Sequence, residues 1–348
     1  MTRLAAKLAT IHPNSPGIGL QNQMDEEQIV LRAILLYLSK AQWARRLVTG
    51  WGFARKAASR FVSGDTLDDA IRVIRSFNEE GIFVTVDRLG ENVSNPEEAR
   101  QATDVYVDIL DRLQREGLQA NISVKLTALG LHLEEVVCLD NVRRIAARAA
   151  EYGIMIRIDM EDSSTVDATL AIHRTLYEEG LTNIGLVIQS YLYRSPADID
   201  MLMTFDTPIR LCKGAYNEPA QVAYPKKSDV DAAYDRLTEK LIDACKAKGS
   251  TECDSQGRVP PIPGIATHDM NRVNHAKAYA ASVELSRRAL EFQMLYGIRS
   301  DLQRELAQEG YPVRIYVPFG TEWYPYYVRR LAERPANVWF FISNFFKR

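Results

Sequence analysis

The sequence lacks several features that would place it in a familiar class of protein. No apolar run reaches the roughly 18 residues of a membrane-spanning helix, and the N-terminus lacks the basic and then apolar pattern of a secretion signal. The four cysteines are scattered without a C-x-x-C pair, which argues against a zinc ribbon and fits a reducing compartment. The net charge of −2 argues against nucleic acid as the main partner. We therefore expect a soluble cytoplasmic protein, with peripheral attachment at the inner face of the membrane left open.

The signature motifs of several enzyme classes are also missing. No group of histidines and carboxylates has the spacing of H-E-x-x-H, so no metal site is predicted. Neither a G-x-S-x-G elbow nor a phosphate-binding loop of the Walker type is present. No G-x-G-x-x-G follows the first predicted strand, which disfavours a doubly wound open sheet, the alternative architecture.

Short apolar strands alternate with long amphipathic helices from residue 81 onward. The chain has 348 residues, of which 46% are hydrophobic and 25% charged, enough for a large core. We predict strands at 83–87, 121–126, 155–159, 185–189, 209–213, 264–267, 292–295 and 313–317, and helices at 96–116, 133–152, 164–179, 196–204, 229–248 and 271–291. Eight such units predict an α/β fold closed into a (βα)8 barrel of the TIM type. The loop 249–263, rich in Gly, Ser and Pro, is predicted to lie on the surface.

The remaining segments flank this barrel. Residues 1–80 are predicted as an N-terminal helical segment packed on the barrel, with helices at 29–43, 53–61 and 66–78. Residues 81–348 are predicted as the catalytic barrel domain with a C-terminal helix. The apolar segment 338–346 either covers the barrel, which we favour, or contacts membrane or quinone.

Polar side chains follow nearly every predicted strand. In such barrels the chemistry lies at the carboxyl ends of the strands. The polar residues there are Asp87, Glu91, Lys125, Asp159, Glu161, Gln189, Arg210, Lys213, Thr267, His268, Asp269, Gln293 and Tyr316. Each alone is weak support for a site, because barrels also bury structural ion pairs. Together they suit an anionic ligand and a large polar cofactor.

A helix predicted after the last strand carries Tyr326, Arg329, Arg330 and Glu333 on one face. Two adjacent guanidiniums make a good clamp for one carboxylate, because each offers a planar fork of donors. The alternative is an exposed helix with an ordinary Arg–Glu pair.

Five motifs resemble the proline dehydrogenase family. They are I-S-V-K-L-T-A-L at 122–129, I-D-M-E at 158–161, R-L-C-K-G-A-Y at 210–216, A-T-H-D at 266–269 and Y-x-x-R-R-x-x-E-R at 326–334. The resemblance covers roughly residues 80–345 and is greatest to the monofunctional bacterial branch. It implies a flavoprotein with FAD on a distorted barrel that oxidises L-proline to 1-pyrroline-5-carboxylate, the first step of proline degradation. Hydride would pass from C5 to the flavin N5, and the electrons would go on to a membrane quinone.

The resemblance also implies roles for individual residues. Asp159, Arg210 and Lys125 would be catalytic, with Asp159 orienting Lys125 and Arg210 lying against the flavin. Substrate would be bound by Lys125, Arg329, Arg330, Tyr326, Tyr316, Leu295 and Glu333. The cofactor would be bound by Met160, Gln189, Arg210, Lys213, Gly214, Ala215, Tyr216, Thr267, His268 and Gln293. Glu91 would pair with Arg329 as a gate. Asp269 stands where the family often has Asn.

Two other functions and one structural alternative stay open at this point. A Schiff-base aldolase could use Lys125 or Lys213 on the same fold. A non-catalytic carboxylate-binding protein would use the same cations. Arg210 could instead form a structural ion pair inside the barrel, for instance with Glu161.

Overall fold

The computed structural model describes Arg55, residues 58–91 and residues 93–333, except for the side chains of residues 332 and 333. The chain divides into two compact units, one of residues 56–323 and one of residues 1–55 with 324–348. The predicted helix 29–43, part of the predicted helix 53–61 and the apolar segment 338–346 lie outside the described residues. The division of the chain at residue 80 stays a prediction.

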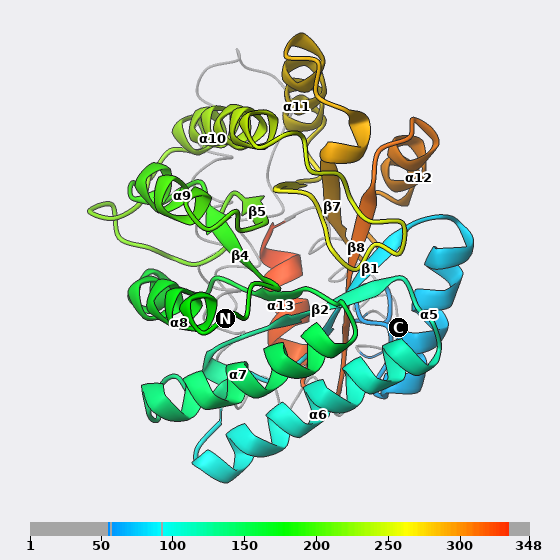
Figure 1. The fold of residues 1–348 in the computed structure, drawn as a ribbon, viewed down its shortest axis with the longest axis vertical. Helices are drawn as coiled ribbons and strands as arrows, with labels where there is room; N and C mark the ends of the chain where they lie inside the picture. The colour runs from blue at the N-terminus through cyan, green and yellow to red at the C-terminus, as the bar shows by residue number, and fades with distance from the viewer. Residues whose placement is uncertain (1–54, 56–57, 92, 334–348) are drawn as a thin grey trace, which may run out of the picture. The chain divides into compact units, whose positions relative to one another are not determined.

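Residues 56–323 contain a closed barrel of parallel strands (Figure 1). Each strand pairs with the next in the chain, and β1 closes the barrel on β8, with Phe83 opposite Arg314. The strands are β1 (Phe83–Arg88), β2 (Ala120–Val124), β3 (Ile156–Ile158), β4 (Ile184–Gln189), β5 (Ile209–Cys212), β6 (Pro263–Ala266), β7 (Glu291–Leu295) and β8 (Val313–Phe319). The predicted (βα)8 fold is confirmed, and the open-sheet alternative is wrong.

Helices alternate with these strands along the chain. They are α5 (Leu67–Glu79), α6 (Pro96–Arg115), α7 (Glu135–Glu151), α8 (Val166–Glu178), α9 (Ser195–Met203), α10 (Lys227–Ala247), α11 (Met270–Ser282) and α12 (Ser300–Gln308), with 3-10 turns at Thr127–Leu129, Ser163–Thr165 and Arg287–Ala289. Thr66 caps α5 and shares a capping box with Asp69. Helix α5 contacts β1 and β8 of the barrel. The last helix, α13 (Trp323–Glu333), lies in the second unit except for its first residue.

Two sequence-based boundaries around β7 are wrong. The helix predicted at 271–291 ends at Ser282, because Glu284 adopts a left-handed conformation with φ of 56° and turns the chain back. Strand β7 then begins at Glu291, whose apolar neighbours had been read as part of the helix. Helix α12 was not predicted at all, since its nine residues are too few to show a clear helical period.

The strands present apolar residues to the helices and polar residues to the barrel interior. On β1, Val84 and Val86 belong to the main hydrophobic cluster, which also contains Tyr106 and Ile109 of α6. The intervening Thr85 points the other way and hydrogen-bonds Asn121 on β2 at 2.6 Å. The alternation therefore gives an apolar outer layer and a polar interior, which is where the chemistry has to be sought.

The loop 249–263 is less exposed than predicted, because it packs against one end of the barrel (Figure 1). The Met155 amide donates to the Arg258 carbonyl at 3.1 Å, next to the start of β3. A Cβ at Gly257 would lie 2.1 Å from the Phe83 ring, so only glycine fits there. The surface position predicted for this loop is wrong at Cys253 and at the end of the loop, where Ile262 is buried.

A buried histidine on α8 gives a pH-dependent prediction. Burial lowers the pKa of His173 to about 4, so the imidazole stays neutral while the unfolded chain titrates near 6.5. Below pH 6.5 the unfolded state therefore binds a proton that the folded state does not. We expect this group to lower the free energy of unfolding by roughly 3 kcal/mol between pH 6.5 and pH 4.

Urea unfolding at pH 7 and pH 4.5 tests this prediction. The stability lost between the two pH values should be smaller in His173→Gln than in the parent, whereas the exposed His132→Gln should behave like the parent. Equal losses in all three proteins would contradict the assignment.

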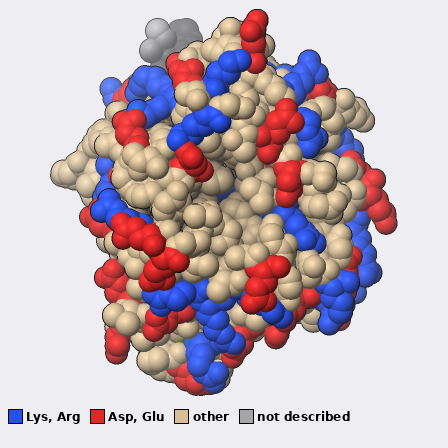
Figure 2. Space-filling view, in the orientation of Figure 1, with Lys and Arg blue, Asp and Glu red and all other residues tan. Residues whose placement is uncertain are grey.

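The face shown in Figure 2 carries acidic and basic side chains interspersed over its whole area. A continuous basic surface of the kind that binds nucleic acid is therefore absent from that face. Among the described helices, none combines the length and the apolar character needed to span a membrane.

Candidate active site

A charged cluster occupies the barrel interior near the carboxyl ends of its strands. We call it the strand-end cluster and define it as Asp87, Lys125, Asp159, Arg210 and Tyr316. The Lys125 ammonium lies 2.8 Å from Asp87 Oδ1, 3.2 Å from the Tyr316 hydroxyl and 3.7 Å from Asp159 Oδ2. The structure thus brings together four residues that the family resemblance assigns to the site, with Asp87, which had been noted only as a strand end.

Asp159 is the acceptor on which three strands converge. Its carboxylate accepts hydrogen bonds from Tyr316 at 2.7 Å, from Arg210 at 2.7 Å and from Ser123 at 3.0 Å. These donors come from β8, β5 and β2. A carboxylate with three donors is held rigidly, which suits a residue that positions its neighbours.

Arg210 is held by a second set of hydrogen bonds besides its contact with Asp159. Its Nε donates to Gln293 Oε1 at 2.6 Å, and Gln293 in turn donates to Glu291 at 2.6 Å. Glu291 forms a paired contact with Arg314, with both distances 2.9 Å. An unbroken chain of hydrogen bonds therefore runs from Arg314 through Glu291, Gln293 and Arg210 to the rest of the cluster.

Glu161, the residue suggested as a structural ion-pair partner of Arg210, is not its partner in the structure. Arg210 pairs with Asp159, whereas Glu161 accepts from the backbone and hydroxyl of Thr127 at 3.1 and 2.5 Å. Residue 161 follows β3 by three positions and lies beyond the pairing that sets the interior register. Arg210 therefore does form an ion pair inside the barrel, but with Asp159.

The protonation of the cluster follows from its burial and its charges. Burial by itself lowers the pKa of Lys125, but Asp87, Tyr316 and Asp159 raise it well above its ordinary value. Burial raises the pKa of Tyr316, and the nearby carboxylates add to this increase. Lys125 is thus an ammonium and Tyr316 a neutral phenol at physiological pH. An aldolase needs a free amine, and Lys213 is likewise paired, with Asp269 at 2.8 Å and with Asp231, so the Schiff-base hypothesis loses support.

Apart from Arg210 and Gln293, which lie within β5 and β7, the residues predicted to bind a cofactor lie at or after the carboxyl ends of β3 to β6. Gln189 is buried, donates to the Met160 and Glu161 carbonyls, and has an Oε1 without a partner among the described residues. Thr267 accepts from the Asp269 amide at 3.1 Å, and His268 Nε2 accepts from the Leu295 amide at 3.0 Å. The His268 proton is therefore on Nδ1. An unused buried amide oxygen, a ring N–H and nearby cations fit a large polar cofactor.

Several residues near the predicted cofactor site have contacts within the protein that explain their positions. Gly214 has φ of 115°, and a Cβ there would lie 2.4 Å from the Tyr191 ring, so the position is explained by Tyr191. Gln293 has both amide atoms engaged inside the barrel. Asp269 caps α11 and pairs with Lys213, which gives the departure from the family's Asn a local explanation. Ala215 and Tyr216 are partly exposed residues after β5.

The predicted carboxylate clamp lies on α13, in the second unit. Within this helix the Arg330 guanidinium lies 5.2 Å from the centre of the Tyr326 ring. The predicted sharing of one helix face by these two residues is therefore confirmed. Arg329 lies on the same helix, and the Glu333 side chain lies outside the described residues. Glu91 follows β1 directly after Gly90.

Asp87 and Ser123 are site residues that the motif analysis did not select. Asp87 was noted only as a strand end, and Ser123 only as a letter of a motif. The signal that identifies them is strand alternation, because Asp87 shares a face with Thr85, and Ser123 lies opposite Asp87 in the register.

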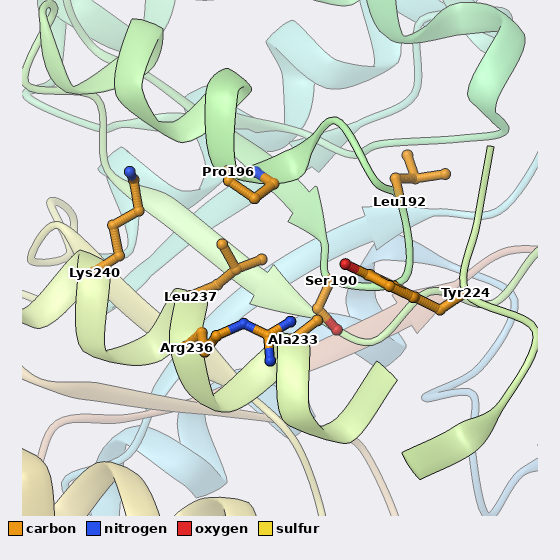
Figure 3. A pocket seen from close by; sticks show the side chains of 8 residues that line it. All are labelled: Ser190, Leu192, Pro196, Tyr224, Ala233, Arg236, Leu237 and Lys240. Carbon is orange, nitrogen blue, oxygen red and sulfur yellow. The ribbon is translucent and has the colours of Figure 1, made fainter. Parts of the chain in front are cut away.

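A separate cavity of about 170 Å³ lies away from the cluster, on the helical side of the sheet between α9 and α10 (Figure 3). Its walls include Ser190, Pro196, Leu237 and Lys240. None of the residues predicted for the site lines it.

Comparison with known proteins gives a consistent result. A sequence model described as proline dehydrogenase matches residues 70–342. The chain is 36% identical over 319 residues to proline dehydrogenase 1 of Bacillus subtilis subsp. natto, covering 92% of this chain and 100% of that protein. It is 40% identical over 294 residues to proline dehydrogenase of Deinococcus radiodurans, covering 83% and 90%.

A solved structure agrees with these sequences. The structure of proline utilization A from Bdellovibrio bacteriovorus inactivated by N-propargylglycine matches with a TM-score of 0.73 at 26% identity. The match covers 91% of this chain but 38% of that longer chain.

Proposed function

Because this chain belongs to the proline dehydrogenase family, we propose that it oxidises L-proline to 1-pyrroline-5-carboxylate with FAD, the first step of proline catabolism. As a member of the family it is an oxidoreductase that acts on proline. The observation that carries the proposal is the strand-end cluster, which holds a permanent ammonium among buried carboxylates at the end of the barrel where ligands bind.

The substrate is held by charge at one end and by ring packing at the other. Arg329, Arg330 and Lys125 bind the proline carboxylate, and their charge offsets the cost of removing that group from water. The pyrrolidine ring packs against Tyr326, Tyr316 and Leu295, with Glu333 at the edge of the site. Support for this arrangement is the fixed ammonium of Lys125 and the shared helix face of Tyr326 and Arg330. Glu91 pairs with Arg329 as a gate.

The cofactor is held at the carboxyl ends of β3 to β7. Met160, Gln189, Lys213, Gly214, Ala215, Tyr216, Thr267 and His268 would hold it, and Arg210 would lie beside its ring. When bound, the flavin would supply the acceptor, at N5, for the hydride from proline C5. Gln293 and Asp159 hold Arg210 in place by the hydrogen bonds described above, so that its charge favours the electron-rich reduced state.

The electrons then need an acceptor, which we propose is a membrane quinone. The enzyme would be cytoplasmic and would reach the quinone through peripheral contact with the inner face of the membrane. A vesicle flotation assay with and without L-proline tests the membrane contact.

The absorbance spectrum of the purified protein tests the proposed function. We expect a yellow protein whose flavin bands bleach on anaerobic addition of L-proline, with D-proline as the matched control. A colourless protein that fails to bind added FAD would overturn the flavin assignment. A flavin-loaded protein that L-proline leaves oxidised would overturn the substrate.

Arg210→Met should separate a catalytic from a structural role for this arginine. Loss of a fixed positive charge beside the flavin should lower its reduction potential and slow reduction by proline, with proline binding close to that of the parent. Spectroelectrochemistry and stopped-flow reduction measure these effects. A folded, FAD-loaded variant with unchanged potential and rate would remove Arg210 from the chemistry, and a variant without FAD and with lower stability would favour the structural role.

A further inference from the structure

Lys125 has two carboxylates within ion-pair distance, and they are not equivalent. Asp87 contacts the ammonium directly at 2.8 Å, whereas the nearest Asp159 oxygen lies 3.7 Å away. Asp159 is already satisfied by donors from Arg210, Tyr316 and Ser123. Its negative charge is therefore shared among several partners, one of which is itself a cation.

Asp87 has Lys125 as its one ion-pair partner among the described residues, with the Tyr316 hydroxyl nearby. It is fully buried, Oδ1 accepts from Lys125, and Oδ2 has no hydrogen-bond partner within the described part of the chain. A buried carboxylate with a single cationic partner directs nearly all of its field at that partner.

We infer that Asp87, and not Asp159, is the residue that positions the Lys125 ammonium and keeps it charged for substrate binding. This inference rests on the proposed function for the identity of the substrate. The coupling between Asp87 and Lys125 exists without substrate and does not depend on the proposed function. Asp87 itself touches neither proline nor cofactor in this scheme, and it acts through Lys125.

The groups that face this pair come from several elements. Around Lys125 they are Asp87 and Glu91 on and after β1, Asp159 after β3 and Tyr316 on β8. Asp159 and Tyr316 also face Asp87, and Tyr106 of α6 lies near it. Burial raises the pKa of Asp87 to about 6, against the attraction of Lys125, so Asp87 is ionised above neutral pH. In that range the carboxylate and the ammonium coexist, and removing the carboxylate should make Lys125 easier to deprotonate.

Competitive labelling of the Lys125 amine by acetic anhydride tests the coupling directly. The comparison uses the FAD-loaded full chain without proline, with Lys125 acetylation at pH 9 measured by peptide mass spectrometry. Asp87→Asn keeps an oxygen acceptor and removes the charge, and Asp159→Asn is the matched control. We expect labelling of Lys125 to be at least about tenfold faster in Asp87→Asn than in the parent, and to change less in Asp159→Asn. An equal or larger effect in Asp159→Asn, or less than a threefold change in Asp87→Asn, would overturn the inference.

Kinetics and a double variant complete the test. In Asp87→Asn the Michaelis constant for proline should rise more steeply with pH than in the parent, and Asp87→Glu should restore the parental profile. If Asp87→Asn does not fold, Asp87→Asn with Lys125→Met should fold, because the stranded ammonium is gone. Failure of both to fold would make Asp87 purely structural. A parent protein that does not respond to L-proline would refute the proposed function but leave the labelling result intact.

Discussion

Arg330→Met is expected to raise the Michaelis constant for L-proline at least about tenfold while FAD content stays near normal. A charge-assisted contact to a carboxylate contributes roughly 1.5–3 kcal/mol, and methionine keeps most of the side-chain volume without the charge. Arg329→Met should behave similarly, and the double variant should lose more than either single variant. Steady-state kinetics over a wide range of proline concentration measure the change.

A surface arginine provides the matched control for this prediction. Arg304 pairs with Glu80 at an exposed position on α12, so Arg304→Met should leave the Michaelis constant unchanged. If Arg330→Met and Arg329→Met both match Arg304→Met, the clamp does not exist and α13 carries an ordinary surface ion pair.

Glu291→Gln should be the most destabilising single substitution considered for the barrel. Glu291 and Arg314 are both within 1% of full burial and share two hydrogen bonds of 2.9 Å. Burial lowers the pKa of Arg314, and Glu291 more than offsets this effect. Because a guanidinium is not deprotonated in proteins, Glu291→Gln leaves it charged and without its counter-charge. A stranded buried charge costs about 3–5 kcal/mol, measurable as a lower midpoint of urea unfolding.

The double variant of Glu291→Leu with Arg314→Met separates charge from packing. It should recover much of the stability lost in Glu291→Gln, because two buried charges are replaced by apolar groups of similar size. Glu80→Gln, which breaks only the exposed pair with Arg304, should cost less than about 1 kcal/mol. Similar losses for Glu80→Gln and Glu291→Gln would show that the interior pair is well solvated.

Sequence patterns predicted the barrel well because each buried strand is a short apolar run between breakers. They failed where that rule is broken. Glu291 and Gln293 alternate with apolar residues on β7, so the start of this strand resembled the end of an amphipathic helix. The nine residues of α12 are too few to show a hydrophobic period that distinguishes them from a surface turn. The buried positions of loop 249–263 likewise show no such period.

The candidate site could be predicted as a set of residues but not as a set of pairs. Motifs selected Lys125, Asp159 and Arg210, and the family resemblance implied Tyr316. The structure links these four residues by hydrogen bonds. The carboxylate that holds Lys125 is determined by the register between β1 and β2 and by how far the side chains extend. A single sequence gives neither the register nor these distances. Asp87 was therefore overlooked in favour of Asp159.

The hydrogen-bonded chain through the barrel has a consequence for how this protein tolerates change. Arg314, Glu291, Gln293, Arg210 and Asp159 are linked one to the next, so each residue sets the environment of its neighbour. Substitutions at linked positions do not add. We therefore expect strong epistasis between the base of the barrel and its mouth, such that Gln293 variants alter the effect of Arg210 variants. Redesign of this interior would have to exchange the linked residues together, whereas the apolar layer outside the strands accepts changes one residue at a time.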